Sequence, residues 1–216
     1  MNNGILKNSL LFNELSGGDR EAVFNISRGT KLDNEQILCY ENDSIENVYF
    51  LLEGCIKSYK VNRFDNEIVL ALQKDCGMIT HYMPCDDDAR YFSNVESVGE
   101  STIVSIEKRA LDHLCENSKS LSEFLCGQFA RKVAELKYII NRDLIYDGLA
   151  KVAFMISENL EDFNSMKRQD AAHILNIQPE TLSRLLAKLK RDGLIEEKNT
   201  KILIKDERRL RDMHEI

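Results

Sequence analysis

The sequence predicts an α+β protein that has an N-terminal antiparallel β-roll, a long helix and a C-terminal winged helix-turn-helix. Short runs of alternating apolar and polar residues, separated by turn residues, extend from about residue 25 to 107. One apolar stripe then follows residues 120–144, and two short helices joined by a tight turn are expected over 168–191. These three observations place the β-roll at 1–116, the long helix at 117–146 and the winged helix-turn-helix at 147–216.

The composition is typical of a globular chain. Of 216 residues, 43% are hydrophobic and 30% are charged, and this length suffices for two small domains. The sequence has no run of about 18 apolar residues, and Met1–Leu15 lacks the basic and apolar regions of a secretory signal. We therefore expect a cytoplasmic protein that has no membrane partner.

The cysteines predict neither disulfides nor a metal centre. They occupy positions 39, 55, 76, 85, 115 and 126, and no two of them form a Cys-x-x-Cys pair. A zinc or iron–sulfur site would normally show at least one close pair. In a chain without a secretory signal, such thiols stay reduced and are mostly small buried apolar groups.

The N-terminal half contains the turn signals of an all-β domain that follows a short helix. Residues 6–24 have weak helical amphipathicity, and Ile45 to Tyr59 predicts two strands that join around Glu53-Gly54. Further strands are expected at 67–72 and 101–106. Several short strands at fairly regular spacing favour a small antiparallel barrel or roll.

The long helix is predicted from one apolar stripe in steps of three and four residues: Leu121, Leu125, Phe129, Val133, Leu136, Ile140 and Leu144. Such a stripe packs either on its own domain or on a twin helix in a dimer, and periodicity alone does not choose between them. The first six residues are our candidates for a dimer interface. Residues 149–160 predict another helix, which is apolar on more than one face and therefore buried.

The C-terminal pattern predicts a helix-turn-helix with a wing. A short helix over 168–175 ends at Asn176, a residue type that tolerates the positive φ of a tight turn. Pro179 suits the first turn of the next helix, and Gly193 suits its termination. A polar turn at 198–200 then separates two short apolar runs, as in a wing. This order is that of a winged helix-turn-helix.

The second helix presents side chains that suit DNA. With its leucines buried, Glu180, Ser183 and Arg184 lie at the N-terminal end, where a recognition helix meets base edges. Arg pairs with guanine O6 and N7, and Glu accepts from cytosine N4. Phosphate contacts are expected from Lys167, Arg168, Thr181, Lys188 and Lys201. An amphipathic hairpin with a solvated charged face would show the same pattern.

The charge distribution agrees with DNA as the partner. The chain carries a net charge of −7, yet residues 165–216 hold 12 Lys and Arg against 9 Asp and Glu. An acidic body repels DNA and leaves the basic end to make the contact.

Three stretches resemble the Crp/Fnr family of transcriptional regulators: Lys167-Arg-Gln-Asp, Gln178-Pro-Glu-Thr-Leu-Ser-Arg184 and Asp192-Gly-Leu-Ile195. The resemblance covers the whole chain in order and implies a roll like that of cyclic-nucleotide-binding domains, a dimerisation helix and a winged helix-turn-helix. The Glu-x-x-Ser-Arg spacing from Glu180 resembles the fumarate–nitrate regulator branch, which implies TTGA-type half-sites in an inverted repeat. Pro179 replaces an Arg of the cyclic-AMP receptor protein, so that protein's operator preference is not expected.

The resemblance also implies partners and a signal. It implies a homodimer on double-stranded DNA that contacts RNA polymerase as an activator does, although the sequence does not distinguish activation from repression. A shift of population driven by an effector in the roll would reorient the two recognition helices. No enzyme motif accompanies these features. The alternative is a dimeric sensor or adaptor that binds a protein partner or a small effector without specific DNA binding.

The effector pocket of the family is altered in this chain. The corresponding region begins at Gly77, the ribose-binding Glu is absent, and Tyr91 or Phe92 occupies the position of the phosphate-binding Arg. Arg90 would be that Arg if the alignment shifts by one residue, but the three aspartates at 86–88 beside it are a poor setting for an anionic phosphate. We expect no cyclic nucleotide, and no N-terminal iron–sulfur cluster because Cys39 is the first cysteine.

Haem and redox sensing remain as candidate signals. Haem-dependent members of the family bind haem in the roll, and His81, near Met83 and Cys85, is our candidate haem ligand. The alternative is a solvent-exposed loop histidine. Cys76 and Cys85 are candidate redox thiols, with ordinary buried cysteines as the alternative.

Overall fold

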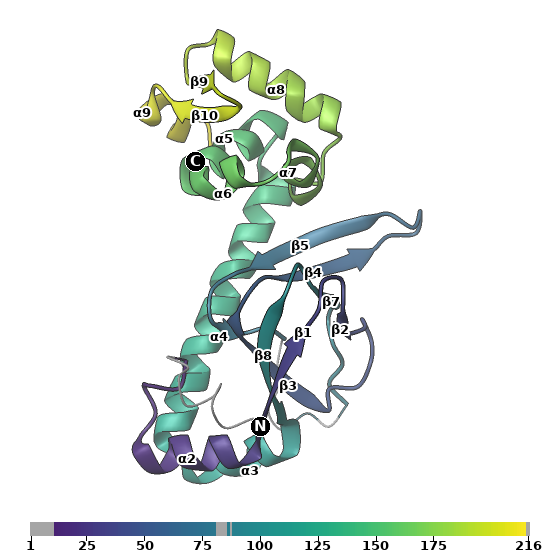
Figure 1. Ribbon diagram of the computed structural model, residues 1–216, viewed down its shortest axis with the longest axis vertical. Helices are drawn as coiled ribbons and strands as arrows, with labels where there is room; N and C mark the ends of the chain where they lie inside the picture. The colour runs from purple at the N-terminus through teal and green to yellow at the C-terminus, as the bar shows by residue number, and fades with distance from the viewer. Residues whose placement is uncertain (1–10, 81–85, 87, 215–216) are drawn as a thin grey trace. The chain divides into compact units, whose positions relative to one another are not determined.

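The computed structural model describes residues 11–80, 86 and 88–214 (Figure 1). The chain divides into two compact units, and the division falls between Glu135 and Leu136, inside the long helix. The predicted boundaries instead set this helix apart as a third segment. Its first part belongs to the β-roll, and its last residues belong to the C-terminal unit.

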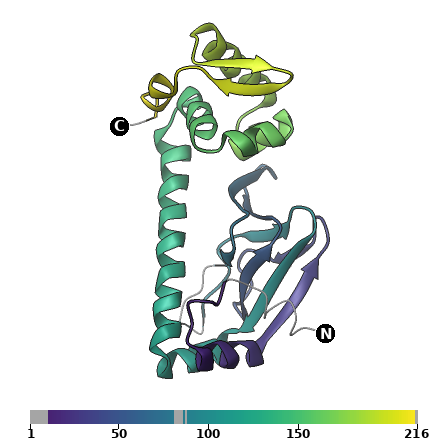
Figure 2. The same cartoon turned by 60° about the vertical axis from the view of Figure 1, so that its left-hand side comes forward.

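The first unit contains two four-stranded antiparallel sheets, in the orders β1-β8-β3-β6 and β2-β7-β4-β5 (Figures 1 and 2). Non-consecutive strands are neighbours in both sheets, so the sequence-predicted antiparallel roll is confirmed. The strands are β1 Ser27–Leu32, β2 Ile37–Cys39, β3 Asn47–Glu53, β4 Ile56–Val61, β5 Glu67–Gln73, β6 Gly77–Met78, β7 Asn94–Ser97 and β8 Ser101–Glu107.

The turn between β3 and β4 depends on glycine, as expected. Gly54 has a φ of 102°, a conformation that residues with a Cβ atom rarely adopt. A Cβ there would lie 2.4 Å from Ser101 Oγ and 2.6 Å from the Glu100 carbonyl oxygen. The predicted strand pair around Glu53-Gly54 is therefore confirmed, with the glycine fitted against strand β8.

Three helices cover one core of the roll: α2 Gly17–Ile26, α3 Lys108–Asn117 and α4 Lys119–Ile140. Of the helical stretch predicted over 6–24, the first residues lie outside the described part of the chain. Ser16 caps the N-terminus of helix α2, and its hydroxyl accepts from the Asp19 N–H. The Asp19 carboxylate accepts from the Ser120 hydroxyl at 2.5 Å, which joins α2 to the start of α4.

Helix α4 corrects part of the predicted dimer interface. Leu121 and Leu125 are 1% and 4% exposed, and both pack in the core of their own domain with Phe50 and Phe124. Phe129 packs against the same core. These residues face the sheet because the apolar stripe begins on the side of α4 that the roll covers. Leu121 and Leu125 are therefore covered within the single chain, whereas Phe129 is only partly covered.

The remaining residues of the stripe are exposed. Val133, Leu136 and Ile140 are 52%, 36% and 49% exposed, so their role in a dimer interface stays a prediction. Helix α4 ends at Ile140 and continues as a five-residue π-helical turn, η1 Asn141–Ile145, which contains Leu144. In the described part of the chain, no helix is long and apolar enough to cross a membrane.

The second unit is built of short helices and a two-stranded wing: α5 Gly148–Glu158, α6 Leu160–Ser165, α7 Arg168–Ile174, α8 Pro179–Arg191, β9 Ile195–Lys198, β10 Lys201–Ile204 and α9 Glu207–Arg211. The predicted helix over 149–160 is confirmed as α5, with Val152, Ala153 and Ile156 fully buried. They share a core with Phe163, the helix-turn-helix leucines and Ile202 of the wing. One core therefore fixes the recognition helix and the wing together.

Candidate DNA interface

The turn between α7 and α8 has the predicted chemistry. Asn176 has a φ of 53°, and Pro179 occupies the start of α8, where its missing N–H costs no hydrogen bond. The N–H of Ile177 donates to the Ala172 carbonyl oxygen at 3.0 Å and closes the turn. The alanines of α7 are fully buried, so the two helices approach closely.

The end of α8 is also fixed locally. Gly193 has a φ of 74°, its N–H donates to the Lys190 carbonyl, and the N–H of Leu194 donates to the Leu189 carbonyl. This pair of bonds is the Schellman motif that ends many helices. The leucines Leu182, Leu186 and Leu189 are buried, and the opposite face of α8 is left to solvent.

The predicted base-reading residues lie on this open face. Glu180, Ser183 and Arg184 are exposed, and Thr181 is half-buried. Within the residues that the structure describes, these four side chains form no hydrogen bond or ion pair. Their polar groups are therefore available to a partner molecule.

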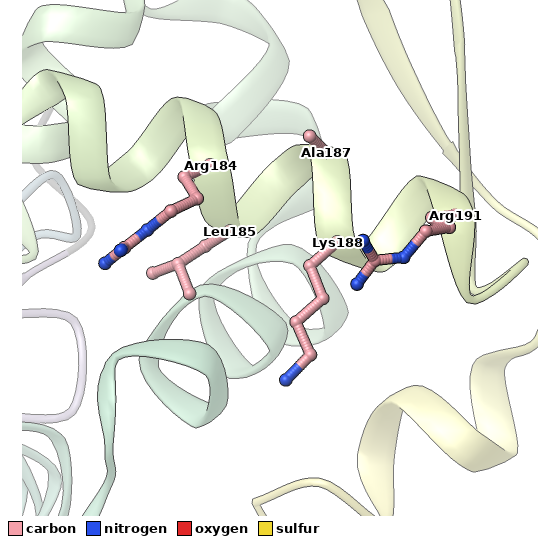
Figure 3. Close-up of a pocket in the computed structure, with 5 residues that line it drawn as sticks. All are labelled: Arg184, Leu185, Ala187, Lys188 and Arg191. Atoms are coloured by element: carbon pink, nitrogen blue, oxygen red, sulfur yellow. The ribbon is translucent and has the colours of Figure 1, made fainter.

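A shallow hollow lies beside the base-reading residues on α8. It is lined by Arg184, Leu185, Ala187, Lys188 and Arg191 (Figure 3). Leu185 lies between Arg184 and Lys188 in Figure 3, and its Cδ1 comes within 3.3 Å of the place of a Cβ on Gly148. The hollow thus has an apolar floor, which packs on the start of α5, and three cationic side chains around it.

The wing is tied to the helices by a network that the sequence did not predict. Asn164 donates to the Ile202 carbonyl at 2.9 Å and accepts from the Ile202 N–H at 2.7 Å. Lys190 of α8 forms an ion pair with Glu197 of β9. Nothing in the spacing of these residues marks them, because the pairing depends on how the wing folds back.

Arg168 departs from its predicted role. Its Nη2 donates to the Thr200 carbonyl oxygen at 3.1 Å and lies 4.0 Å from Glu197. Its guanidinium also stacks over the Phe163 ring, 4.5 Å from the centroid. In this structure Arg168 therefore binds the wing rather than extending as a free phosphate ligand. Lys167, Lys188 and Lys201 are exposed, as predicted.

The carboxylates of the wing neutralise cations that are not part of the open face. The hydrogen bond from Lys190 lowers the pKa of Glu197, against the opposing effect of burial. The hydrogen bond from Lys205 lowers the pKa of Glu196 in the same way. Between residues 167 and 201 of the described unit, the cationic side chains without an ion-pair partner are Lys167, Arg184, Lys188 and Lys201, whereas Lys190 is paired with Glu197.

The sensor candidates are only partly described. His81 and Cys85 lie outside the described residues. Cys76 is half-buried, its thiol donates to the Leu52 carbonyl at 3.5 Å, and it packs against the roll's core. Burial raises the pKa of the Cys39 thiol to about 12, so that thiol stays protonated. Among the residues with described positions, no three His, Cys, Asp or Glu side chains gather as metal ligands.

The residues at the altered phosphate position are engaged within the roll. Tyr91 is buried, and its hydroxyl donates to the Asn47 carbonyl at 2.8 Å. Arg90 donates to the Asn42 carbonyl at 2.8 Å. Both side chains thus serve local structure in this conformation.

Solved structures with the same fold include several regulators. A double mutant of CooA from Carboxydothermus hydrogenoformans aligns with a TM-score of 0.70 and 20% identity, covering 95% of this chain and 94% of that one. FixK2 from Bradyrhizobium japonicum aligns with a TM-score of 0.67 and 16% identity, covering 88% and 98%. The c-di-GMP-responsive global regulator CLP from Xanthomonas campestris aligns with a TM-score of 0.66 and 14% identity, covering 88% and 99%.

The sequence itself matches two family models in succession. Residues 30–118 match the cyclic nucleotide-binding domain, and residues 152–213 match the Crp-like helix-turn-helix domain. A comparison with curated proteins gave no match. The two matched domains follow in the order of a Crp/Fnr regulator and together cover most of the chain, and the matched family consists of regulators rather than enzymes. The chain therefore belongs to the Crp/Fnr family of DNA-binding transcriptional regulators.

Proposed function

We propose that this regulator binds an inverted repeat of TTGA-type half-sites as a homodimer, with Glu180, Ser183 and Arg184 reading the bases. One observation carries the proposal. These three side chains are exposed and unengaged at the N-terminal end of α8, whereas Arg168, Lys190 and Lys205 of the same unit are held by internal partners.

The chemistry of these residues suits the half-site. A TTGA step contains one G·C pair, whose major-groove edge presents guanine O6 and N7 and the cytosine N4 amino group. Arg184 can donate two hydrogen bonds to the guanine, and Glu180 can accept from the cytosine. Ser183 is short and adjusts to either base. The half-site preference thus depends mainly on two charged side chains.

The phosphate contacts surround the base-reading residues. We assign them to Lys167, Thr181, Lys188 and Lys201, which lie on α7, α8 and the wing. Each neutralised phosphate releases condensed counterions, so affinity should fall steeply with salt. Arg168 is not assigned a phosphate contact of its own, because its side chain binds the wing at Thr200.

The homodimer is proposed from the uncovered part of α4. Val133, Leu136 and Ile140 follow one another at helical spacing and are exposed in the single chain. A second copy of the same helix would cover them in a two-fold arrangement. To bind successive major grooves, the two recognition helices of such a dimer would have to lie about 34 Å apart, one turn of DNA. RNA polymerase is the proposed protein partner of the DNA-bound dimer.

The proposed signal is not a cyclic nucleotide and acts on the roll. Haem with nitric oxide, or a redox change, would act through His81, Cys85 or Cys76. The fold does not name the effector, since a regulator of the same fold responds to the cyclic dinucleotide c-di-GMP, and so the proposal depends on the altered residues of the roll. An anaerobic UV–visible spectrum with and without haem tests the haem proposal, and His81→Ala should abolish any Soret band.

Binding to a labelled duplex decides the main proposal. Two TTGA half-sites in inverted repeat should bind with a steep salt dependence, and a scrambled duplex should bind more weakly by about a thousandfold or more. Arg184→Ala should remove most of that preference. A dimer that binds neither duplex specifically, yet retains a protein or small-molecule partner, would support the adaptor instead.

A further inference from the structure

The wing turn has a defined geometry that needs support. Asn199 and Thr200 have φ values of 49° and 66°, so both central residues of the turn are left-handed. Two such residues make a two-residue hairpin turn that matches the twist of its strands. Asn tolerates this conformation, but the β-branched Thr200 does not adopt it readily. Lys198 and Lys201 are paired directly across the turn.

Arg168 supplies the support at that residue. Its hydrogen bond reaches the main-chain oxygen of Thr200, the residue with the least favourable φ. The other side of the guanidinium contacts α6, through a 3.5 Å hydrogen bond to the Phe163 carbonyl and stacking on the Phe163 ring. Phe163 is fully buried, so the stack rests on the unit's core. The side chain of Arg168 is about one third exposed.

The other side-chain contacts to the wing bind its strands and not its turn. Asn164 binds Ile202 in β10, and Lys190 binds Glu197 in β9. Arg168 binds the turn itself and also lies 4.0 Å from Glu197. Its loss would therefore free the turn while the strands remained attached.

We propose that Arg168 is a positioning residue that holds the wing turn in place, so that the wing forms a second contact to the DNA backbone through Lys201. This inference rests on the proposed DNA binding and assigns the phosphate contact to Lys201 and not to Arg168. Lys201 is exposed and has no ion-pair partner among the described residues. Lys198, by comparison, lies 3.4 Å from Glu196.

The chain offers a matched control for a direct phosphate ligand. Lys167 precedes Arg168, is exposed, and forms no ion pair or side-chain hydrogen bond within the described residues. A phosphate contact by Lys167 would not pass through the wing. The loss of DNA affinity caused by Lys167→Gln should therefore add to the loss caused by Lys201→Gln. The loss caused by Arg168→Gln should not add to it.

The first test needs no DNA. Amide hydrogen exchange is measured on the full-length protein and on Arg168→Gln, with Lys167→Gln as the control. The amides of Lys198 and Lys201, which are paired across the turn, should exchange roughly tenfold faster or more in Arg168→Gln, because a hydrogen bond from a charged donor is lost, whereas the Ile202 amide stays bonded to Asn164. Lys167→Gln should leave them unchanged. Equal protection of the wing in all three proteins would overturn the positioning role.

The second test is a double-mutant cycle on the TTGA duplex, measured by fluorescence anisotropy from about 50 to 200 mM salt, a range over which phosphate contacts change affinity strongly. Lys201→Gln and Arg168→Gln should each lower the log–log salt slope by about one unit, and the double variant by about one unit, not two. Arg168→Lys should not restore binding, because an ammonium group cannot stack on Phe163 and span to Thr200.

The outcomes separate this inference from the proposed function. Additive losses from Arg168→Gln and Lys201→Gln, or full rescue by Arg168→Lys, would make Arg168 a direct phosphate ligand and overturn the inference. A wild-type protein that binds no duplex would overturn the proposed function, and the exchange experiment would still decide whether Arg168 holds the wing.

Discussion

Gln128 of helix α4 accepts a hydrogen bond from the main-chain N–H of Met78 at 2.9 Å, and so joins the long helix to strand β6. Gln128 is 4% exposed, and its Oε1 lies 3.0 Å from the place of a Cβ on Gly77. Lys132, one turn further on, donates to Gln73 at 3.1 Å. The helix is thus bonded to the strand region that follows Gln73, where the family's effector pocket would begin.

Gln128→Leu should destabilise the roll by about 1–3 kcal/mol, because the buried Met78 N–H loses its acceptor. The midpoint of thermal unfolding, followed by circular dichroism, measures the effect. Gln169→Leu is the control, since Gln169 is exposed on α7. Equal midpoints for the two variants would show that water replaces Gln128 at this position.

Ile140→Lys should convert the proposed dimer to a monomer without unfolding it. Ile140 is 49% exposed in the single chain, so a lysine disturbs little there, but it would place like charges at the two-fold interface. Sedimentation velocity measures the oligomeric state. Leu203→Lys, at a 41% exposed apolar site on the wing, is the matched control and should stay dimeric. A dimeric Ile140→Lys would move the interface off this part of α4.

Leu121→Ala should lower stability without affecting dimerisation, because Leu121 was predicted at the dimer interface but lies in the core of the roll. Because Leu121 is 1% exposed in the core of the roll, its truncation should cost about 2–5 kcal/mol of stability. Association of the folded protein should be unchanged. A large loss of stability together with intact dimers would confirm that Leu121 serves the domain and not the partner.

Glu180→Gln should relax base preference at one position of the half-site. A glutamate accepts from cytosine N4, whereas a glutamine pairs best with adenine. Discrimination for the G·C pair should fall by about 1–3 kcal/mol, or roughly 5- to 150-fold. Competition binding with single-base variants of the duplex measures it. Lys188→Gln is the comparison: it should weaken all duplexes alike and lower the salt slope by about one unit.

The local parts of this fold could be predicted from the sequence because they depend on local chemistry. Gly54, Asn176 and Gly193 each have a positive φ that few residue types adopt, Pro179 suits the first turn of a helix, and each lies where its turn was expected. The alternation of the longer strands is equally local. Strands β1, β2, β6 and β7 were missed. Three of them have only two to four residues, which carry too little periodicity, and Leu32 is the single large apolar residue of β1.

The contacts between distant parts of the chain could not be predicted from such local patterns. A stripe on α4 shows which residues share a face, but not what covers it, and so Leu121 and Val133 received one role although the roll buries only the first. Arg168 likewise carries the charge of a phosphate ligand. Its attachment to Thr200 arises because the wing returns, 32 residues later, to the start of α7.

The ion pair between Lys190 and Glu197 predicts a pH dependence of stability. The hydrogen bond from Lys190 lowers the pKa of Glu197 below its usual 4.5 in the folded protein. Its contribution is therefore fully present above about pH 4.5 and is lost as the pH falls through the folded-state pKa. Glu197→Gln should be less stable than wild type at neutral pH, and the difference should shrink below pH 4.5. Denaturant unfolding at several pH values measures this difference. Glu161→Gln, at an exposed site on α6, should show no such trend.

Thr200→Gly should stabilise the wing, in contrast to most substitutions. The left-handed conformation costs a side-chain-bearing residue about 1–2 kcal/mol, and Thr200 has a φ of 66°. Glycine removes that cost. It also raises the conformational entropy of the unfolded chain, and this entropy offsets about half of the gain in stability. The bond from Arg168 is kept, because it ends on the main-chain oxygen. Thermal unfolding should show a net gain of roughly 0.5–1 kcal/mol. Asn199→Ala should do the opposite, since alanine lacks the tolerance of asparagine at a φ of 49°. A loss of stability in both variants would mean that the Thr200 side chain itself supports the turn.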